Sequence, residues 1–419
     1  MKVIEGWSEK KLSELAEYIN GYSFKPDDWG EDGLPIIRIE QLKNPNELID
    51  YSSGKIPQKN IIENGDLIFS WSASLFLRIW QHGRAALNQH LFKVIEKEGV
   101  DRVFLKLFIE FYLPELTKAS HGSTMQHITR KELDRFRAPF PISKFEQTKI
   151  AEILSKVDQA IEQTEALIAK KQRIKTGLMQ DLLTRGIDEH GNLRSEETHE
   201  FKDSPLGRIP VEWEVKPCAA LCREIVVGIV IRPAQYYRPE GIPVLRSANV
   251  RENTIFCDDL VFISKTDNEM LSKSRLREGD LVTVRTGYPG TTSVIPRELD
   301  GSNCVDLVIS RPKNEVIRSN FLSIWVNSDN GKRQVLEGQG GLAQQHFNVG
   351  EMRTLLVKVP DISEQEKIER ILILQSSVLE DLTRTLQKLF SLKTALMQDL
   401  LTGKTRVTAL FNQTEVADV

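Results

Sequence analysis

Seven residues, Leu178-Met179-Gln180-Asp181-Leu182-Leu183-Thr184, occur a second time as Leu396-Met397-Gln398-Asp399-Leu400-Leu401-Thr402. Each copy closes a long run in which apolar residues recur at helical spacing between Glu, Lys, Gln and Arg. Such spacing is typical of an amphipathic helix that is able to supercoil with a partner. The runs open at Glu146-Gln147 and at Glu364-Gln365, so they have the same length. The sequence therefore predicts two long helices of matched length.

The apolar residues of each run form three adjacent rows, a face wider than the seam of a two-stranded coiled coil. We therefore expect each helix to contact more than its one partner helix. An ordinary long helix packed only on its own domain is the alternative, and the matched length and sequence argue against it. The residues expected at the helix–helix contact or at a docking surface are Ile153, Ile161, Leu167, Leu178, Leu182, Leu372, Leu379, Leu386, Leu396 and Leu400.

Whole domains are repeated as well as helices. Gly33-Leu34-Pro35-Ile36-Ile37-Arg38 returns as Gly241-Ile242-Pro243-Val244-Leu245-Arg246, and Gly65-Asp66-Leu67-Ile68 returns as Gly279-Asp280-Leu281-Val282. A nearly constant offset between the copies indicates one duplicated unit with loop insertions. Short β-branched runs after turn residues indicate strands, so the fold class is α+β, with two similar strand-rich domains, each followed by a long helix.

The expected organisation follows from these repeats. The expected segments are a first strand-rich domain at 1–141, a central helix at 142–185, a linker at 186–209, a second strand-rich domain at 210–360, a C-terminal helix at 361–403 and a tail at 404–419.

The chain connection favours an antiparallel helix pair, because the end of the first helix and the start of the second domain then fall at the same end of the pair. A parallel pair remains possible, since the linker is long enough to reach far. An antiparallel pair gives the protein an approximate two-fold axis, and DNA has local two-folds of its own. A protein with such an axis can contact two DNA half-sites at a fixed separation. Because the loops of the two domains differ, we expect the two half-sites to have different sequences.

Composition limits the class of protein. The chain has 419 residues, enough for two or three domains, and its 40% hydrophobic and 27% charged residues are typical of a globular protein. No run of apolar residues is long enough to predict a membrane span. The four cysteines form no zinc-binding set, which favours reduced, structural cysteines in a cytoplasmic protein. A net charge of −3 allows nucleic-acid binding only if basic residues cluster locally.

Catalytic motifs are missing from the sequence. The chain has no phosphate-binding Gly-x-x-x-x-Gly-Lys-Ser/Thr loop, no Asn-Pro-Pro-Tyr motif of amino-methyltransferases and no Gly-x-Gly-x-x-Gly loop. No His and Cys residues stand at metal-ligand spacing. We therefore expect no enzymatic activity and no metal site in this chain.

The chain resembles the specificity (S) subunits of type I restriction–modification systems over nearly its whole length. The resemblance is carried by Lys202-Asp-Ser-Pro-Leu-Gly-Arg-Ile-Pro-Val-Glu-Trp213, by the doubled Leu-Met-Gln-Asp-Leu-Leu-Thr and by the Glu-Gln-x-Lys-Ile that opens each helix. It implies two target-recognition domains, each reading half of a split target in double-stranded DNA, and an antiparallel coiled coil that sets the spacing. It also implies that methyltransferase (M) subunits dock on the helices and that restriction (R) subunits join through that core. S-adenosylmethionine, ATP and Mg are then expected on those partners, with no cofactor or membrane bound by this chain.

DNA contacts require Arg, Lys, Asn, Gln or Ser at base edges and basic or amide groups at phosphates. The candidates are Arg38, Ser70, Trp71, Ser72, Arg78, Gln126 and His127 in the first domain, and Arg246, Arg285, Thr286, Tyr288, Gln339, Gln344, Gln345 and His346 in the second. Four of these candidates are shared between the copies: Arg38, Arg246, His127 and His346. For them, a structural role within the domain is at least as well supported as contact with DNA. Arg285, which we match to Ser72, and Gln339 or Gln344 are better candidates for base reading because these positions differ between the copies.

Two alternatives from other classes remain at this stage. One is a stand-alone architectural protein whose coiled coil bridges two DNA segments. The other is a scaffold that binds only proteins. Phosphate contacts should make DNA binding fall steeply with salt, so a lack of salt dependence would favour the scaffold.

Overall fold

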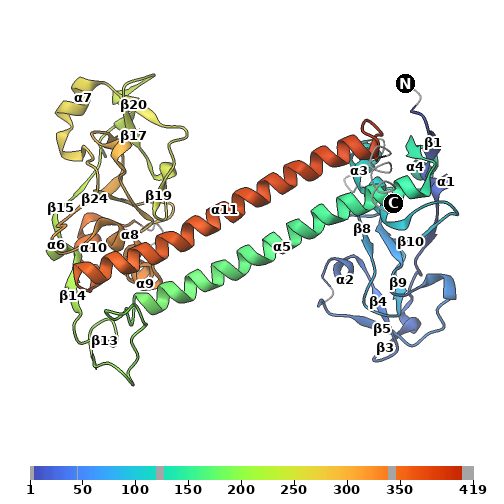
Figure 1. Ribbon diagram of the computed structural model, residues 1–419, viewed down its shortest axis with the longest axis horizontal. Helices are drawn as coiled ribbons and strands as arrows, with labels where there is room; N and C mark the ends of the chain where they lie inside the picture. The colour runs from blue at the N-terminus through green and yellow to red at the C-terminus, as the bar shows by residue number, and fades with distance from the viewer. Residues whose placement is uncertain (1–3, 45, 119–126, 338–345, 408–419) are drawn as a thin grey trace, which may run out of the picture. The chain divides into compact units, whose positions relative to one another are not determined.

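The computed structural model describes residues 4–44, 46–118, 127–337 and 346–407 (Figure 1). The chain forms two compact units, one made of residues 1–165 with 384–419 and the other of residues 166–383. Each unit combines a strand-rich domain with one stretch from each of the two long helices. Within the described ranges no helix is both long and apolar enough to cross a membrane, and the four cysteines are free.

The first unit is built on a four-stranded antiparallel sheet and a five-stranded sheet. The four-stranded sheet has the order β2 (Ala16–Asn20), β10 (Leu91–Glu96), β7 (Leu67–Ser70) and β8 (Phe76–Ile79). The five-stranded sheet has the order β3 (Trp29–Gly30), β5 (Asp50–Ser52), β4 (Leu34–Ile37), β9 (Ala85–Leu87) and β6 (Ile61–Ile62). Strand β1 (Trp7–Lys11) pairs with β11 (Arg137–Pro141). The helices of this domain are α1 (Leu12–Leu15), α2 (Ile39–Lys43), α3 (Arg102–Lys118) and α4 (Arg130–Arg135).

The second unit repeats this topology. Its main sheet has the order β15 (Cys222–Val227), β24 (Leu307–Pro312), β21 (Leu281–Val284) and β22 (Thr292–Val294). A second sheet has the order β16 (Tyr237–Arg238), β20 (Val261–Ile263), β17 (Ile242–Leu245) and β23 (Asn303–Cys304). Strand β14 (Glu214–Pro217) pairs with β25 (Leu356–Val359) as β1 pairs with β11. The remaining elements are β12 (Phe201–Lys202), β13 (Ile209–Pro210), β18 (Val250–Arg251), β19 (Thr254–Ile255), α6 (Cys218–Leu221), α7 (Lys265–Met270), α8 (Ser319–Asn327), α9 (Asp329–Glu337) and α10 (Val349–Thr354).

The repeated Gly-Asp pair makes the turn that starts the central strand of each main sheet. Gly65 and Gly279 have φ of 92° and 82°, a left-handed conformation that glycine adopts without steric cost. The Asp66 carboxylate accepts a hydrogen bond from the Glu63 backbone N–H at 2.8 Å, and Asp280 accepts one from Arg277 at 3.0 Å. The motif is therefore explained by turn geometry in both units.

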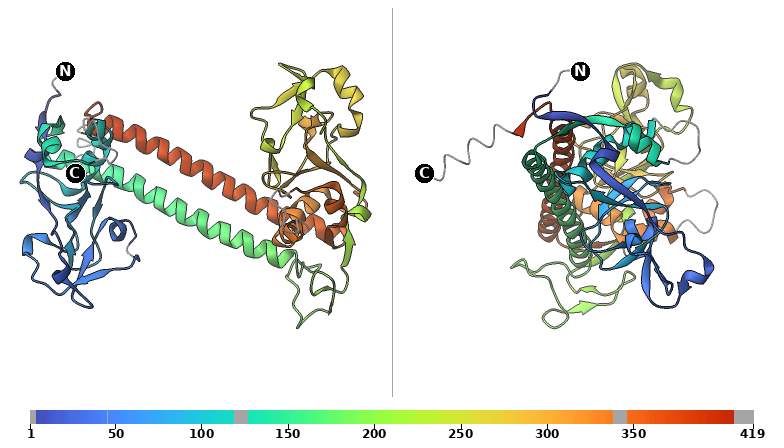
Figure 2. Two further views of the ribbon diagram at one scale, coloured as in Figure 1. Left: turned by 180° about the vertical axis from the view of Figure 1, so that it is seen from behind. Right: turned by 90° about the vertical axis from the view of Figure 1, so that its right-hand side faces the viewer.

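The two long helices are α5 (Lys144–Leu182) and α11 (Ile362–Leu401), and they run antiparallel (Figures 1 and 2). In the first unit the start of α5 packs against the end of α11, where Ile150 and Leu154 share a core with Leu400. In the second unit the end of α5 packs against the start of α11, where Leu182 shares a core with Ile368. The antiparallel arrangement and the internal repeat expected from the sequence are confirmed.

A buried glutamate ties three chain segments together at the start of each helix. In the second unit, Glu364 accepts hydrogen bonds from Trp213 Nε1 at 3.0 Å, from Arg194 Nη1 at 2.5 Å and from the Ile187 N–H at 2.8 Å. Its side chain is 5% exposed. Arg194 lies in the segment that follows α5, so this contact joins the domain, the start of one helix and the extension of the other.

The first unit contains the same arrangement. The Glu146 carboxylate accepts hydrogen bonds from Arg406 Nε at 2.6 Å and Nη2 at 2.8 Å, and from Trp7 Nε1 at 3.4 Å. Arg406 follows α11, as Arg194 follows α5. We call the two sites the helix-start joints, defined as Trp7–Glu146–Arg406 and Trp213–Glu364–Arg194.

The glutamine next to each glutamate anchors the preceding strand. Gln147 Nε2 donates to the Pro141 carbonyl at 2.9 Å, and Gln365 Nε2 donates to the Pro360 carbonyl at 2.9 Å. Each amide oxygen also accepts a backbone N–H, from Asp101 at 2.7 Å and from Arg318 at 2.9 Å. Both side chains of the repeated Glu-Gln pair therefore form hydrogen bonds that attach each domain to its helix.

Lys358 in β25 is an unusual member of the second core, because its side chain is only 1% exposed and makes no ion pair within the described ranges. Burial lowers the pKa of its amine from 10.5 to about 8. Because the pKa is lower in the folded state, the charged amine destabilises the fold below pH 8, and this cost fades as pH rises towards 10.5.

We expect Lys358→Met to raise the free energy of unfolding by about 1–2 kcal/mol at pH 7, since it removes a buried charge. The gain should shrink at about pH 9.5, where the folded amine is already neutral. Urea unfolding at both pH values tests this, with Lys216→Met on the neighbouring strand as the control. An equal gain at both pH values would show that packing, and not charge, is responsible.

Candidate nucleic-acid interface

In the first unit an aromatic cluster lies where β7 ends. Trp71 follows β7, and its ring centroid is 6.0 Å from that of His90 and 5.9 Å from that of His127. Trp71 Nε1 and His127 Nδ1 are buried and have no hydrogen-bond partner within the described ranges. Unused donors and acceptors at a sheet end are the groups that a bound polar ligand can satisfy.

The backbone holds this cluster in place. Ser72 and His127 form an isolated antiparallel bridge, and the Ile128 N–H donates to the Trp71 carbonyl at 3.0 Å. His127 is therefore fixed beside β7.

In the second unit Arg285 occupies the equivalent position at the end of β21. The Phe347 N–H donates to the Arg285 carbonyl at 2.9 Å, as Ile128 donates to Trp71. Arg285 thus corresponds to Trp71, and not to Ser72 as the sequence comparison proposed. The repeated Gly-Asp turn gives the same correspondence, because Trp71 follows Gly65 by six positions and Arg285 follows Gly279 by six positions, with no insertion between turn and strand end.

An acidic partner orients Arg285. Its Nη1 is paired with the Asp306 carboxylate, which also accepts a hydrogen bond from Thr286 Oγ1 at 3.1 Å. Arg285 Nε is buried without a partner within the described ranges. A guanidinium held on one side by a carboxylate can present its other donors to a base edge or a phosphate.

In each unit one glycine allows a second loop to approach the end of the main sheet where Trp71 or Arg285 lies. A Cβ on Gly21 would lie 2.1 Å from the Asn88 carbonyl oxygen, and one on Gly228 would lie 2.6 Å from that of Cys304. Only glycine therefore allows this approach, which places Tyr22 in a bridge with Asn88 and Ile229 in a bridge with Val305.

The sequence analysis missed several residues that the fold brings to these edges. In the first unit they are Tyr22, Gln89 and His90; in the second they are Ile231, which is 75% exposed, and Asp306. The polar triplet Asn88-Gln89-His90 between two apolar strands was a usable signal. Asp306 carried no such signal, because its role depends on the pairing with Arg285.

The shared arginines are engaged within their own domains. Arg38 pairs with Asp50, and its guanidinium lies 4.9 Å from the ring centroid of Trp29. Arg246 donates to the Asp259 carboxylate at 2.9 Å. These contacts favour the scaffold role that the sequence comparison allowed for both residues.

The other candidates fall into distinct environments. Ser70 is fully buried and donates to the Ser74 carbonyl at 2.5 Å. Arg78 is exposed and makes no ion pair within the described ranges, His346 is exposed, and Tyr288 is 82% exposed beside Gly287. Gln126, Gln339, Gln344 and Gln345 lie outside the described residues, so the fold places none of these glutamines.

Some of the helix residues proposed as an interface are buried within the two units, and others are exposed. Ile161, Leu182, Leu372 and Leu400 are buried, Ile153, Leu178, Leu379, Leu386 and Leu396 are half-buried, and Leu167 is 40% exposed. Other helix residues remain exposed, including Ile174 at 43% and Leu374 at 56%. Within the described ranges no group of His, Cys, Asp or Glu is arranged to hold a metal ion.

Comparisons with known proteins agree with this arrangement. The profile of the type I restriction modification DNA specificity domain matches residues 4–171. The chain is 25% identical to the type I restriction enzyme MjaVIII specificity subunit of Methanocaldococcus jannaschii, over 97% of this chain and 95% of that protein. It is 23% identical to the EcoBI specificity subunit of Escherichia coli, over 88% of this chain and 79% of that protein.

Solved structures share the fold. The S subunit of a type I restriction–modification system from M. genitalium has a TM-score of 0.59 and 15% identity, covering 96% of this chain and 97% of that one. A chain from a structural study of type I complex assembly and conformational transition has a TM-score of 0.57 and 16% identity, covering 97% of this chain and all of that one. Residues 4–171 therefore match a type I restriction modification DNA specificity domain, and the chain is similar over nearly its whole length to specificity subunits of type I restriction–modification systems, whose fold it shares.

Proposed function

We propose that each strand-rich domain reads one half of a split, asymmetric target in double-stranded DNA. The observation that carries this proposal is the pair Trp71 and Arg285, which occupy equivalent backbone positions but present different chemistry. Equivalent positions with different side chains suit two different half-sites, since an aromatic ring and a guanidinium make different contacts with base edges.

The helix pair is proposed to set the spacing between the half-sites and to dock methyltransferase subunits, with restriction subunits joining that core. Exposed apolar side chains on both helices support a protein-binding role. Methylation, ATP-dependent translocation and cleavage are assigned to those partners, which would bind S-adenosylmethionine, ATP and Mg. This chain would act as a non-catalytic, cofactor-free subunit in the cytoplasm.

The variant Arg285→Ala tests half-site reading. We expect a loss of about 1–3 kcal/mol in binding to the native target and relaxed preference at one base position. The complex with the methyltransferase subunit would be used to methylate a library of DNA targets, and the modified positions would be sequenced.

The control for this experiment is Arg223→Ala, which removes an exposed arginine paired with Glu315 in the same domain. The half-site recognised by the first unit should stay unchanged in both variants. Unchanged affinity and site preference for Arg285→Ala would remove Arg285 from the recognition surface. A change in both half-sites would contradict the assignment of one half-site to each domain.

A further inference from the structure

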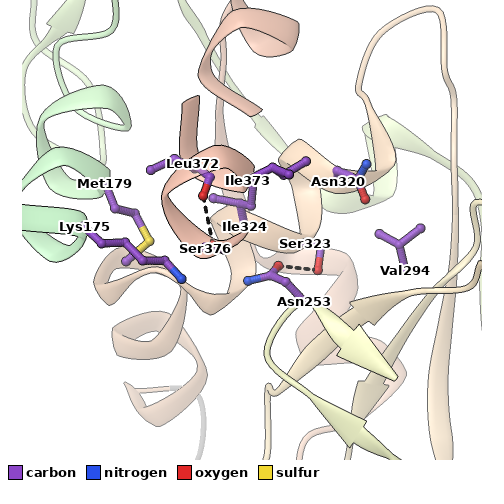
Figure 3. A pocket seen from close by; sticks show the side chains of 10 residues that line it. All are labelled: Lys175, Met179, Asn253, Val294, Asn320, Ser323, Ile324, Leu372, Ile373 and Ser376. Atoms are coloured by element: carbon purple, nitrogen blue, oxygen red, sulfur yellow. Dashed lines mark hydrogen bonds between the residues drawn. The ribbon is translucent and has the colours of Figure 1, made fainter. Parts of the chain in front are cut away.

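A pocket of about 250 Å³ lies in the second unit, between the end of α5, the start of α11 and the adjoining domain (Figure 3). Lys175 and Met179 reach it from α5, Ile373 and Ser376 from α11, and Asn253 from the domain. All of these residues belong to the same compact unit. The pocket combines one cationic side chain with polar and apolar walls.

The internal repeat shows what Lys175 lacks. Each residue of α5 corresponds to the residue of α11 that stands 218 positions later, as Leu178 does to Leu396. Lys393, the counterpart of Lys175, forms an ion pair with Asp158 at 2.6 Å in the first unit. The counterpart of Asp158 is Ser376, so the second unit has the lysine without the carboxylate.

Ser376 does not replace the missing acceptor. Its hydroxyl donates to the Leu372 carbonyl of its own helix at 2.9 Å. Within the described ranges Lys175 makes no hydrogen bond or ion pair, although it is half-buried. A half-buried ammonium group without an acceptor is an unfavourable arrangement that an anionic ligand would relieve.

A second donor faces the same space. The Asn253 amide oxygen accepts a hydrogen bond from Ser323 Oγ at 2.8 Å, which directs the amide nitrogen away from Ser323. Figure 3 shows that this nitrogen and the Lys175 amine point toward each other across the pocket. Two converging donors with no acceptor between them suit a carboxylate.

The walls of the pocket favour a protein side chain over a DNA phosphate. Met179, Ile324 and Val294 give it apolar surface, and Ile373 at its edge is 47% exposed. A phosphate is bound at exposed, polar positions and gains nothing from such walls, whereas the methylene groups of Glu or Asp do.

We propose that this pocket receives the carboxylate of an Asp or Glu side chain from a methyltransferase subunit that docks on the helix pair. The carboxylate would pair with Lys175 and accept a hydrogen bond from Asn253, in the place that Asp158 fills in the first unit. The inference rests on the proposed docking function and adds the position and chemistry of one contact.

The test measures the affinity of the full-length chain for the purified methyltransferase subunit of the same operon. Lys175→Met keeps the length and apolar character of the side chain but removes the charge, and it should weaken binding by about tenfold or more. Ser376→Asp should weaken binding similarly, because it supplies within the chain the carboxylate that Lys393 already has. Thermal unfolding of each variant checks that the fold is kept.

The matched control is Lys393→Met in the first unit, which should change binding by less than about twofold because that lysine is already neutralised. A charge-reversed Lys175→Glu whose binding is restored by one Asp→Lys or Glu→Lys substitution in the methyltransferase subunit would identify the partner residue. Wild-type affinity for both Lys175→Met and Ser376→Asp would overturn the inference. Unchanged binding to the methyltransferase with weaker, less salt-dependent binding to DNA would assign the pocket to a phosphate and also overturn it.

Failure of the wild-type chain to bind the methyltransferase subunit would remove the docking proposal itself, and this inference with it. That outcome is distinct from the others, because the wild-type affinity is measured separately from the variants.

Discussion

Glu364→Ala is expected to destabilise the second unit by about 3–5 kcal/mol, the range found when one partner of a buried ion pair is removed. The substitution leaves Arg194 charged and only 9% exposed at its side chain, with no carboxylate to accept its hydrogen bonds. It also leaves the indole N–H of the fully buried Trp213 and the Ile187 N–H without an acceptor. Each of these groups adds a desolvation penalty that the native joint avoids.

Thermal unfolding measures the loss, and hydrogen exchange locates it. Amides of β14 and β25 should lose protection in Glu364→Ala, because both strands lead into the joint. Glu366→Ala is the matched control, since Glu366 lies two residues away, is 64% exposed and is 3.9 Å from Arg318. The stability of Glu364→Gln should lie between those of Glu364→Ala and Glu366→Ala, because glutamine keeps one acceptor oxygen but loses the charge. Equal stability of Glu364→Ala and Glu366→Ala would contradict the joint.

Arg406→Ala is expected to destabilise the first unit by about 3 kcal/mol or more, for the same physical reason with the charges exchanged. The Glu146 carboxylate is 1% exposed and would keep only Trp7 Nε1 at 3.4 Å as a donor. Hydrogen exchange of β1 and β11 should report the loss, because Trp7 belongs to β1.

The control for this variant is Lys404→Ala, which removes an exposed ion pair with Asp399 in the same segment. Such surface pairs contribute about 0–1 kcal/mol. The double variant Glu146→Gln/Arg406→Ala should be more stable than Arg406→Ala alone, because it removes the unpaired buried charge. Additive losses in the double variant would show that the two side chains do not act as a pair.

The helix pair and the repeat were predictable, because both leave local signals in the sequence. The doubled Leu-Met-Gln-Asp-Leu-Leu-Thr marks the end of each helix, and the apolar spacing marks its buried face. The Gly-Asp turn was also accessible, since a left-handed glycine followed by a turn-capping Asp has a recognisable pattern.

The helix-start joints were not predictable. Arg194 and Arg406 lie 170 and 260 positions from the glutamates that they contact, one after each helix and with no shared motif around them. No periodicity connects such positions, so only the antiparallel fold brings them together. The sequence did show that Glu-Gln is repeated, but not that the pair attaches each domain to its helix.

The recognition surface was predictable in location and not in detail. Both clusters lie after the predicted central strands, at Trp71 and at Arg285. The pairing of Arg285 with Asp306 and the position of His90 beside Trp71 depend on crossing loops, which two glycines allow. The similarity to specificity subunits leaves the stand-alone bridging protein and the partner-free scaffold without support.

The most direct measurement is methylation mapping of the wild-type chain. The chain would be expressed with the methyltransferase subunit of its own operon in a host that lacks DNA methylation, and the modified bases would be sequenced. We expect a split motif with two different half-sites at fixed spacing, absent when this chain is omitted. No sequence-specific methylation by a correctly assembled, active complex would contradict it.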